Sequence, residues 1–526
     1  MMTLTHKMND AIAVNPAQIK KVILEKDGIT LSEFIAVARY KAELTFSDHY
    51  VEKIKKSRNL VDRFLSEGRL IYGVTTGLGD NVREMITPEE SETLQVNTLR
   101  SHAVAVGEPL DEEAVRAIQL MILISFGQGY SGVSFELVDL IKAFLNNQIY
   151  PFAPGEGSVG YISVEGHIFL PLIGEGRAWY KGKLLNGDEA LKQAGLAPVR
   201  LKCKEGLALI SGTTSVTALG ILALYNAMIV TKSSDIVGAM TYEVLKGTVK
   251  ALDSRAHQLK MHVEQQETAQ NLLAILKNSE IMNKYKDFKV QDSLPLKCMP
   301  QTLGAVKRTL HEAWTSVDEE MHSCSDNPII IPSGDDGEAL MCGNFDASYV
   351  GIHMDSASIA MGTLAKFSER LTDRLMNRHL NDLPPFLTEN PGINNGLMIL
   401  QYTSAGLVGE IKVLSHPSSV DSIPTCASQE DVVTFAYYAS KKAYLISKKL
   451  EYIVAIQMMA STEALCFIHD AKPSPVIQKL YKMIRRYVPK VENDRHFYPD
   501  IENIKKLIHE RKIIECVENE TGPLSF

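Results

Sequence analysis

The sequence predicts a mainly α-helical fold, with a long central helical bundle and a smaller N-terminal region of mixed helices and strands. From about residue 206 onward, four segments of about 20–35 residues repeat their apolar side chains with the 3.6-residue period of a helix. Polar loops rich in proline and glycine separate these segments, which lets long helices pack side by side with functional groups on the loops at their ends. We therefore expect two regions, residues 1–205 and residues 206–526.

The first region alternates strand, turn and helix signals. KKVILE has the apolar, β-branched composition of a strand, and the DG pair behind it predicts a turn. Thr30 or Ser32 then begins a helix, with Glu33 available for an N-terminal capping pair. The further expected elements are a helix over 51–68 that ends at Gly68, a glycine-rich loop over 69–84, and helical segments over 89–108 and 112–146.

The second region is expected to contain long helices over residues 218–247, 300–322, 346–378 and 432–465. The apolar stretch 206–230 is long enough to cross a membrane. It also contains the polar side chains of Ser211, Thr213, Thr214, Ser215, Thr217 and Asn226. Because that polar density is unusual for a membrane span, we expect a helix buried in the core of the bundle and no membrane partner.

The composition argues against several classes of partner. A formal net charge of −8 and the lack of a Lys/Arg-rich block disfavour a surface for nucleic acids or anionic membranes. The seven cysteines are scattered without a CxxC pair, which is typical of the reducing cytoplasm and offers no zinc or other metal site. The N-terminal stretch lacks the apolar segment of a secretory signal. We expect a cytoplasmic protein that acts on a small molecule.

The stretch PGEGSVGYISVEGH places Gly155, Gly157 and Gly160 at the spacing of a dinucleotide-binding loop. Such a loop must follow a strand and begin a helix, whereas the β-branched and aromatic residues after Gly160 are poor helix formers. A phosphate-binding P-loop also requires a Lys-Ser or Lys-Thr pair, and none follows. We therefore predict no nucleotide binding here.

Four polar residues lie on separate predicted loops or helix ends, and each has a structural and a functional interpretation. Tyr72 either completes a core or acts as a general base, if a nearby positive charge lowers its pKa. His102 is either a structural histidine or a substrate ligand. Glu430 either caps the helix that follows it or binds a ligand. Lys297 is either a solvated charge or an anchor for an anion.

Several segments stand in an order and spacing typical of one known family. They are YGVTTGLG, GEGSVG followed by GHIFLPLIGEGRAWYKGK, KEGLALISGT, VQDSLPLKCMPQ, SDNPII, CGNFDA and SHPSSVDSIPTCASQED. From about residue 20 to about residue 490, the chain resembles the aromatic amino-acid ammonia-lyases, and within them the histidine ammonia-lyases. The resemblance implies a helical bundle of the ammonia-lyase and aspartase type. It also implies a homotetramer in which several subunits contribute to each active site.

The resemblance assigns roles to individual residues. Tyr72 matches the base that removes the β-proton of the substrate. His102 and Glu430 match the two residues that bind an imidazole ring in the histidine-specific branch. Three further residues match positions around the carboxylate and the reacting carbon of the substrate: Gln291, Asn327 and Phe345.

Other positions depart from the family pattern. Ser211 stands where family members have an asparagine that contacts their electrophilic cofactor, and Leu294 stands where they have a tyrosine. Lys297 stands where they have an arginine that binds the substrate carboxylate. A lysine makes a less directional contact with a carboxylate than the two-pronged arginine does.

The segment that forms the family's cofactor also departs. Family members cyclise an Ala-Ser-Gly tripeptide just after GSVG into methylidene-imidazolone. In this chain, residues 161–166 read Tyr-Ile-Ser-Val-Glu-Gly, and the segment is about three residues shorter. Ser163 is followed by Val164, whose side chain hinders the backbone attack that glycine permits. We expect that this cofactor does not form.

A substrate with a quaternary ammonium group does not need the electrophile, because its amine leaves in the neutral form and has no proton to lose first. The resemblance then implies the ergothionase-type branch of the family, which eliminates trimethylamine from ergothioneine to give thiourocanate. In this interpretation, Tyr161 and Phe345 surround the trimethylammonium group by cation–π attraction. Two alternatives stay open: an inactive homologue that binds an imidazole ligand, and a lyase for histidine or histidine betaine.

Overall fold

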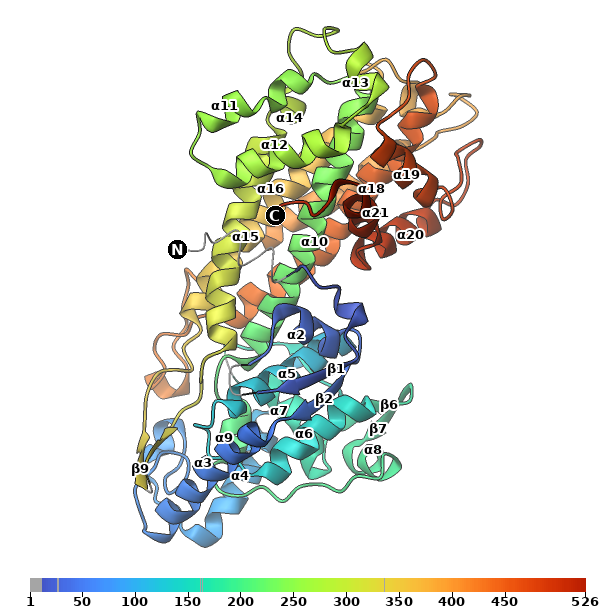
Figure 1. Cartoon of the computed structure of the whole chain (residues 1–526). Coiled ribbons are helices and arrows are strands. Elements are labelled where there is room, and N and C mark those ends of the chain that lie inside the picture. The colour runs from blue at the N-terminus through green and yellow to red at the C-terminus, as the bar shows by residue number, and fades with distance from the viewer. Residues whose placement is uncertain (1–11, 26–27, 161, 163, 335) are drawn as a thin grey trace.

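The computed structural model describes residues 12–25, 28–160, 162, 164–334 and 336–526. It confirms the mainly helical fold with a long central bundle (Figure 1). The bundle consists of α10 (Thr214–Val244), α15 (Met299–Met321), α16 (Ser348–Met376), α17 (Met398–Leu414) and α18 (Ala436–Ala464). Helix α17 was not among the predicted segments. It buries few of its side chains, so its sequence carries little of the amphipathic signal on which the prediction rests.

Helix α10 is the core helix that the polar content of residues 206–230 predicted. All of its residues are buried, and several of its hydroxyl groups donate to carbonyls one turn earlier in the helix: Thr231 Oγ1 donates to the Ala227 carbonyl over 2.7 Å, for example. Two helical stretches, Glu205–Val244 and Ala436–Phe467, are long and apolar enough to span a membrane, but 94% and 83% of their most apolar parts are buried inside the protein. Both stretches therefore serve as core helices of the bundle.

The N-terminal region packs short helices around small sheets. Strand β1 (Lys21–Leu24) pairs in parallel with β2 (Glu43–Phe46), and a capping box of Thr30 and Glu33 begins α2 (Leu31–Ala38), as predicted. The predicted helical segment 112–146 is interrupted near Gly129 and Gly132, which have positive φ. The other elements are α3 (Asp48–Ser66), η2 (Gly79–Arg83), α4 (Pro88–His102), α5 (Glu112–Gly127), α6 (Phe135–Asn147), β4 (Tyr150–Pro151), η3 (Leu170–Ile173), β6 (Arg177–Tyr180), β7 (Lys183–Asn186), α8 (Gly187–Gln193) and α9 (Glu205–Ile210).

The glycine-rich stretch corrects one expectation. Strand β5 (Pro154–Glu156) pairs antiparallel with β3 (Val106–Pro109), and the short helix α7 (Val164–Phe169) follows it. The expectation that this stretch is a poor helix start was wrong, because packing overrides the weak propensity: a Cβ on Gly166 would lie 2.7 Å from the backbone carbonyl of His102. The antiparallel pairing of β5 still differs from the parallel βαβ unit that nucleotide binding requires.

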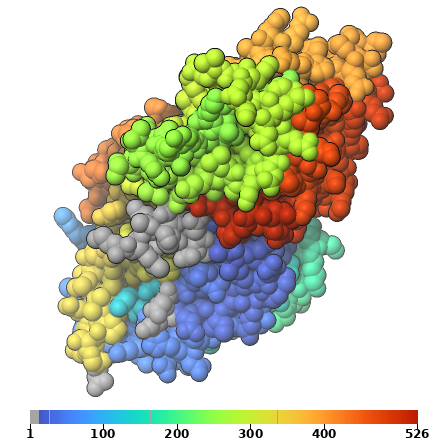
Figure 2. Space-filling view, turned by 45° about the horizontal axis from the view of Figure 1, so that its top comes forward, coloured from blue at the N-terminus to red at the C-terminus, as the bar shows by residue number. Residues whose placement is uncertain are grey.

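The C-terminal helices surround the far end of the bundle. Figure 2 shows the C-terminal residues, in red, lying against the blue N-terminal region, and there Arg511 Nη1 donates to the carbonyl oxygen of Val14 over 3.0 Å. The N-terminal and C-terminal parts of the described chain are therefore in direct contact. The remaining elements are η1 (Pro16–Gln18), η4 (Val249–Leu252), α11 (Ser254–Gln258), α12 (Val263–Leu276), α13 (Glu280–Lys284), α14 (Leu294–Lys297), β8 (Ile329–Ser333), β9 (Asp336–Leu340), η5 (Pro385–Leu387), η6 (Cys426–Ser428), η7 (Leu465–Phe467), α19 (Pro475–Ile484), α20 (Tyr498–His509) and α21 (Lys512–Thr521).

Candidate active site

A cavity of about 820 Å³ lies where loops of the N-terminal region meet loops of the bundle. Its walls come from the loop after α3, from α4, from the segment after β5, from the end of α9, and from bundle loops near residues 327, 345 and 425–430. Nine residues were predicted to form the site. Six of them line this cavity: Tyr72, His102, Ser211, Asn327, Phe345 and Glu430.

Tyr72 lies on the glycine-rich loop, and the amide of Gly79 donates a hydrogen bond to its hydroxyl oxygen over 2.8 Å. Burial raises the pKa of Tyr72, the hydrogen bond from Gly79 opposes that rise, and the nearby Glu430 carboxylate adds to it. The sequence analysis required a positive charge that lowers this pKa. No lysine or arginine supplies it among the described residues that line the cavity.

His102 is the last residue of α4. Its Nδ1 lies 2.7 Å from the carbonyl oxygen of Thr98 and 3.1 Å from Ser101 Oγ. Because a carbonyl can only accept, Nδ1 carries the proton of the neutral ring and Nε2 is left as an acceptor. Gly166 of α7 packs directly on the His102 backbone. The fold therefore fixes both the position and the tautomer of this ring.

Glu430 closes a tight loop with Thr425. The Thr425 amide donates to the Glu430 carbonyl over 2.8 Å, and the Thr425 hydroxyl donates to Glu430 Oε2 over 3.1 Å. Residues 426–428 all have positive φ, which costs about 1 kcal/mol or more for each non-glycine residue. The interpretation of Glu430 as a helix cap was wrong, because Phe435 also has positive φ and α18 begins only after it.

Three further predicted residues line the cavity: Ser211, Asn327 and Phe345. Ser211 is the residue after α9, and its amide donates to the Leu207 carbonyl over 2.9 Å. Asn327 Oδ1 accepts the Cys342 amide over 2.9 Å. That bond leaves the side-chain NH₂ group of Asn327 available as a donor to a ligand.

Buried charges hold the wall elements together. Lys204 Nζ lies 2.6 Å from Asp326 Oδ2, with side chains 0% and 4% exposed. Glu165 of α7 is also buried, and its Oε1 accepts the amide of Ser215 in the first turn of α10 over 3.2 Å. Burial raises the pKa of Glu165. These contacts tie the segment after β5 to the long helices of the bundle.

The sequence matches a known protein family. Residues 29–486 match the family model described as aromatic amino acid lyase. The chain belongs to this family. Histidine ammonia-lyase of Caldanaerobacter subterraneus subsp. tengcongensis is 39% identical over 95% of this chain and 99% of its own length. Histidine ammonia-lyase of Symbiobacterium thermophilum is 40% identical over 94% of this chain and 98% of its own length.

Solved structures of the family share the fold. Histidine ammonia-lyase from Trypanosoma cruzi superposes with a TM-score of 0.88 at 31% identity, over 95% of each chain. Ergothionase from Treponema denticola, in complex with desmethyl-ergothioneine sulfonic acid, superposes with a TM-score of 0.85 at 26% identity, over 94% of this chain and 99% of the other. The lyase family that the motifs indicated is therefore confirmed.

Two of the residues that the family resemblance singled out lie away from the cavity within one chain. Lys297 is the last residue of α14, and its Nζ donates to Gln291 Oε1 over 3.0 Å. Figure 1 shows α14 at the end of the bundle opposite α4 and α9. The structure of a single chain thus does not bring Lys297 and Gln291 to Tyr72. The remaining predicted residue, Tyr161, lies outside the described residues.

Several lining residues were missed by the sequence analysis. One face of α4 lines the cavity with Leu94, Asn97, Thr98 and Ser101. Their i, i+3, i+4, i+7 spacing, together with His102, was a signal that could have been found. Glu84 also lines the cavity, but nothing in its sequence surroundings indicates this, because the folding of its loop alone places it there.

Proposed function

We propose that this chain is a carbon–nitrogen lyase that eliminates trimethylamine from an imidazole betaine, with ergothioneine giving thiourocanate, and that it acts without methylidene-imidazolone. The observation that carries the proposal is the altered cofactor segment beside a cavity that keeps Tyr72, His102 and Glu430. The ergothionase of Treponema denticola shares this fold, as does the histidine ammonia-lyase of Trypanosoma cruzi, so the fold is compatible with either reaction.

The residues after Gly160 do not fit the family's cofactor. Its formation requires a serine between two small residues, so that the backbone can fold back on itself, whereas Ser163 stands between Ile162 and Val164. Val164 is fully buried as the first residue of α7, and the neighbouring Glu165 is bonded to α10. Residues 164–169 thus form a helix that packs against the bundle. The proposed reaction proceeds without the electrophile.

The ring-binding groups suit an imidazole-2-thione. In the thione form, both ring nitrogens carry a hydrogen, so the ring needs two acceptors. Nε2 of His102 is one acceptor, because Nδ1 donates to Thr98, and the carboxylate of Glu430 is the second. The neutral imidazole of histidine offers only one N–H donor. The two acceptors are therefore compatible with a thione ring, as they are with the imidazole ring that the matching residues bind in the histidine-specific branch.

Tyr72 acts as the base of the elimination. Its phenolate oxygen, to which Gly79 donates, takes the proton from the β-carbon of the substrate. The electron pair of the C–H bond forms the double bond to the α-carbon, and the C–N bond breaks to release neutral trimethylamine. Because burial and Glu430 raise the pKa of Tyr72, the phenolate needs a compensating positive charge, which the quaternary ammonium group provides.

The carboxylate of the substrate needs an anchor. Asn327 offers its NH₂ group from the cavity wall. We assign Lys297 and Gln291 to the same task in a cytoplasmic homotetramer, in which α14 of a neighbouring copy reaches the cavity. Exposed apolar side chains on α16 and α17, such as Tyr349 and Tyr402, support an assembly through these helices.

A histidine ammonia-lyase is the alternative that sequence similarity favours, since the relatives at 39% and 40% identity carry that name. An inactive imidazole-binding homologue is the other alternative. Purified protein is incubated separately with ergothioneine, histidine betaine and histidine, while trimethylamine, ammonia and the absorbance of the conjugated product are measured. Trimethylamine from ergothioneine is expected.

Other outcomes of this experiment discriminate against the proposal. Ammonia from histidine would overturn it in favour of the first alternative, and no product from any of the three compounds would favour the inactive homologue. Intact-mass spectrometry of the same sample adds an independent check, because a mass lower by two water molecules would reveal the cyclised cofactor.

A further inference from the structure

The charged residues of the cavity are all acidic. Among the described residues that line it, Glu84 and Glu430 are the only Asp, Glu, Lys or Arg side chains. The described residues therefore contribute two carboxylates and no lysine or arginine to the cavity. Such a wall attracts a cationic ligand and repels an anionic one. The proposed function uses Glu430 for the ring, which leaves the role of Glu84 open.

Glu84 is carried by the same loop that holds the base. It follows η2, its amide donates to the Asn81 carbonyl over 3.0 Å, and its carbonyl accepts the Gly77 amide over 2.9 Å. Two residues further on, the Ile86 amide donates to the Thr75 carbonyl over 3.0 Å. Residues 77–86 thus fold back on the Tyr72 loop, and the position of the Glu84 backbone is fixed relative to the base.

Apolar side chains accompany this carboxylate in the cavity wall. They are Ile86, Leu94, Val104 and Ile162. A quaternary ammonium group has no N–H to donate, so it is recognised by contacts of its methyl groups with apolar or aromatic surfaces and by through-space attraction to a negative charge. A primary ammonium group instead needs hydrogen-bond acceptors placed around it. The combination of apolar walls with a carboxylate suits the quaternary group.

We propose that Glu84 is a specificity-determining residue that selects substrates with a trimethylammonium group; this rests on the proposed function and names the group that the carboxylate recognises. The attraction acts on the bound substrate and disappears when the C–N bond breaks, because trimethylamine leaves in the neutral form. The other product, an anionic thiourocanate, is repelled by the same carboxylate. Glu84 therefore favours substrate over product in the cavity.

The test uses Glu84→Gln, the charge-retaining Glu84→Asp, and Glu89→Gln as a matched control. Glu89 is an exposed residue of the first turn of α4 that does not line the cavity. Glu84→Gln is expected to raise KM for ergothioneine about threefold to tenfold with little change in kcat, and to lose most of that effect at high salt. Binding of thiourocanate is expected to stay the same or to tighten. Glu89→Gln is expected to remain close to wild type, and Glu84→Asp, which keeps the charge on a shorter side chain, is expected to give a KM between those of wild type and Glu84→Gln.

Equal KM values for Glu84→Gln and Glu89→Gln would overturn the inference, as would an equal loss of affinity for ergothioneine and for thiourocanate. The proposed function is judged separately, by trimethylamine release from the wild-type protein. If no trimethylamine is released, calorimetric titration of ergothioneine into wild type and Glu84→Gln decides the inference alone. Weaker binding to the variant then supports Glu84 as the recognition group, and equal or absent binding refutes it.

Discussion

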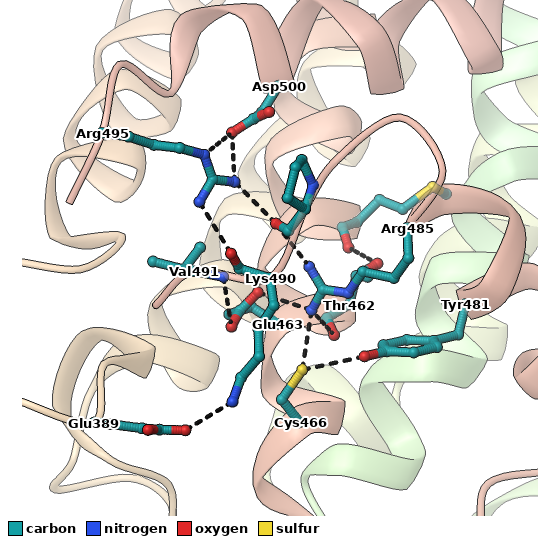
Figure 3. Close-up of polar contacts among 12 residues, drawn as sticks. Glu389, Thr462, Glu463, Cys466, Tyr481, Arg485, Lys490, Val491, Arg495 and Asp500 are labelled. Atoms are coloured by element: carbon teal, nitrogen blue, oxygen red, sulfur yellow. Dashed lines mark hydrogen bonds and ion pairs between the residues drawn. The ribbon is translucent and has the colours of Figure 1, made fainter. Parts of the chain in front are cut away.

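The two ends of the bundle differ in whether their charged side chains are paired with side chains of opposite charge. At the C-terminal end, Glu463 is buried and accepts from Arg485 Nη2 over 2.8 Å and from the Val491 amide over 3.3 Å, while Arg485 also donates to the Thr462 carbonyl (Figure 3). This C-terminal polar cluster balances its acids and bases within one chain. The cavity is lined by acidic side chains with no lysine or arginine among its described residues.

This difference separates stability from function. A charge that is balanced inside the chain contributes to the folded state, and its loss leaves a buried partner without compensation. Glu84 faces a cavity whose described lining residues include no lysine or arginine, so its charge can act on a ligand. Substitutions at the C-terminal polar cluster should therefore change stability alone, and substitutions in the cavity should change activity alone.

Tyr72→Phe gives the largest expected effect and tests the cavity side. Turnover should fall about 10³-fold, because a general base typically contributes 10²–10⁴-fold. Ligand binding and the melting temperature should change little, because the hydrogen bond that the hydroxyl accepts from the Gly79 amide lies in a loop at the cavity and not in the core. Steady-state kinetics, ligand titration and thermal unfolding measure the three quantities. Undiminished turnover would remove Tyr72 as the base.

The C-terminal polar cluster supplies a matched control for this substitution. Tyr481→Phe also removes one phenolic hydroxyl, which lies 3.2 Å from Cys466 Sγ. It should leave turnover at the wild-type level. An equal loss of turnover in both variants would show that the two ends are not functionally separate.

Glu463→Gln tests the stability side. The substitution leaves the largely buried guanidinium of Arg485 without its counter-charge, and breaking such a pair costs roughly 3–5 kcal/mol. The free energy of unfolding should fall by about that amount, while kcat/KM of the folded protein stays unchanged. Denaturant unfolding followed by activity measurements on the same sample checks both halves. A large drop in kcat/KM with unchanged stability would contradict the separation.

Much of the fold was predictable from the sequence, because the spacing of apolar residues in a long amphipathic segment indicates which face of the helix is buried. The periodicity identified α10, α15, α16 and α18, and the order of the motifs led to Tyr72, His102 and Glu430, which line one cavity. Local sequence signals gave wrong helix boundaries where the conformation of a loop decides where the helix begins. Glu430 was open to interpretation as a helix cap because a run of positive φ values leaves no trace in the sequence.

Lys297 and Gln291 illustrate a second limit of the sequence. Their motif resembles that of a substrate anchor, yet one chain places them together at the end of the bundle opposite α4. The motif specifies residue types, whereas the position of these residues in the fold depends on how the whole chain packs. Glu84 illustrates the converse, since it lines the cavity without belonging to any motif.

Glu243→Gln tests how a buried carboxyl group makes stability depend on pH. Burial raises the pKa of Glu243 to about 7, while its Oε1 accepts the Ser474 amide over 2.8 Å. A raised pKa means that the folded state holds the proton more tightly than the unfolded state does. The contribution of this group to stability is therefore full below the unfolded pKa, near 4.3, and is lost as pH rises to about 7.

Gln cannot titrate and resembles the protonated acid. The stability of Glu243→Gln relative to wild type should therefore increase between pH 4 and pH 8, by roughly 3 kcal/mol. Denaturant unfolding at the two pH values measures this difference. A relative stability that does not change with pH would show that Glu243 titrates normally in the folded protein.

Lys490→Met gives the smallest expected effect and marks the boundary of the C-terminal polar cluster. Lys490 Nζ donates to Glu389 Oε1 over 2.8 Å, but both side chains are exposed, at 40% and 57% (Figure 3). Exposed ion pairs stabilise little, so the melting temperature should fall by less than about 2 °C at pH 7. Lys490 lowers the pKa of Glu389, so the small gain is present above the unfolded pKa of that carboxyl and is lost on acidification. The melting temperatures of wild type and variant should coincide at acidic pH. A loss of stability as large as that of Glu463→Gln would mean that the Lys490–Glu389 pair stabilises the fold as a buried pair does.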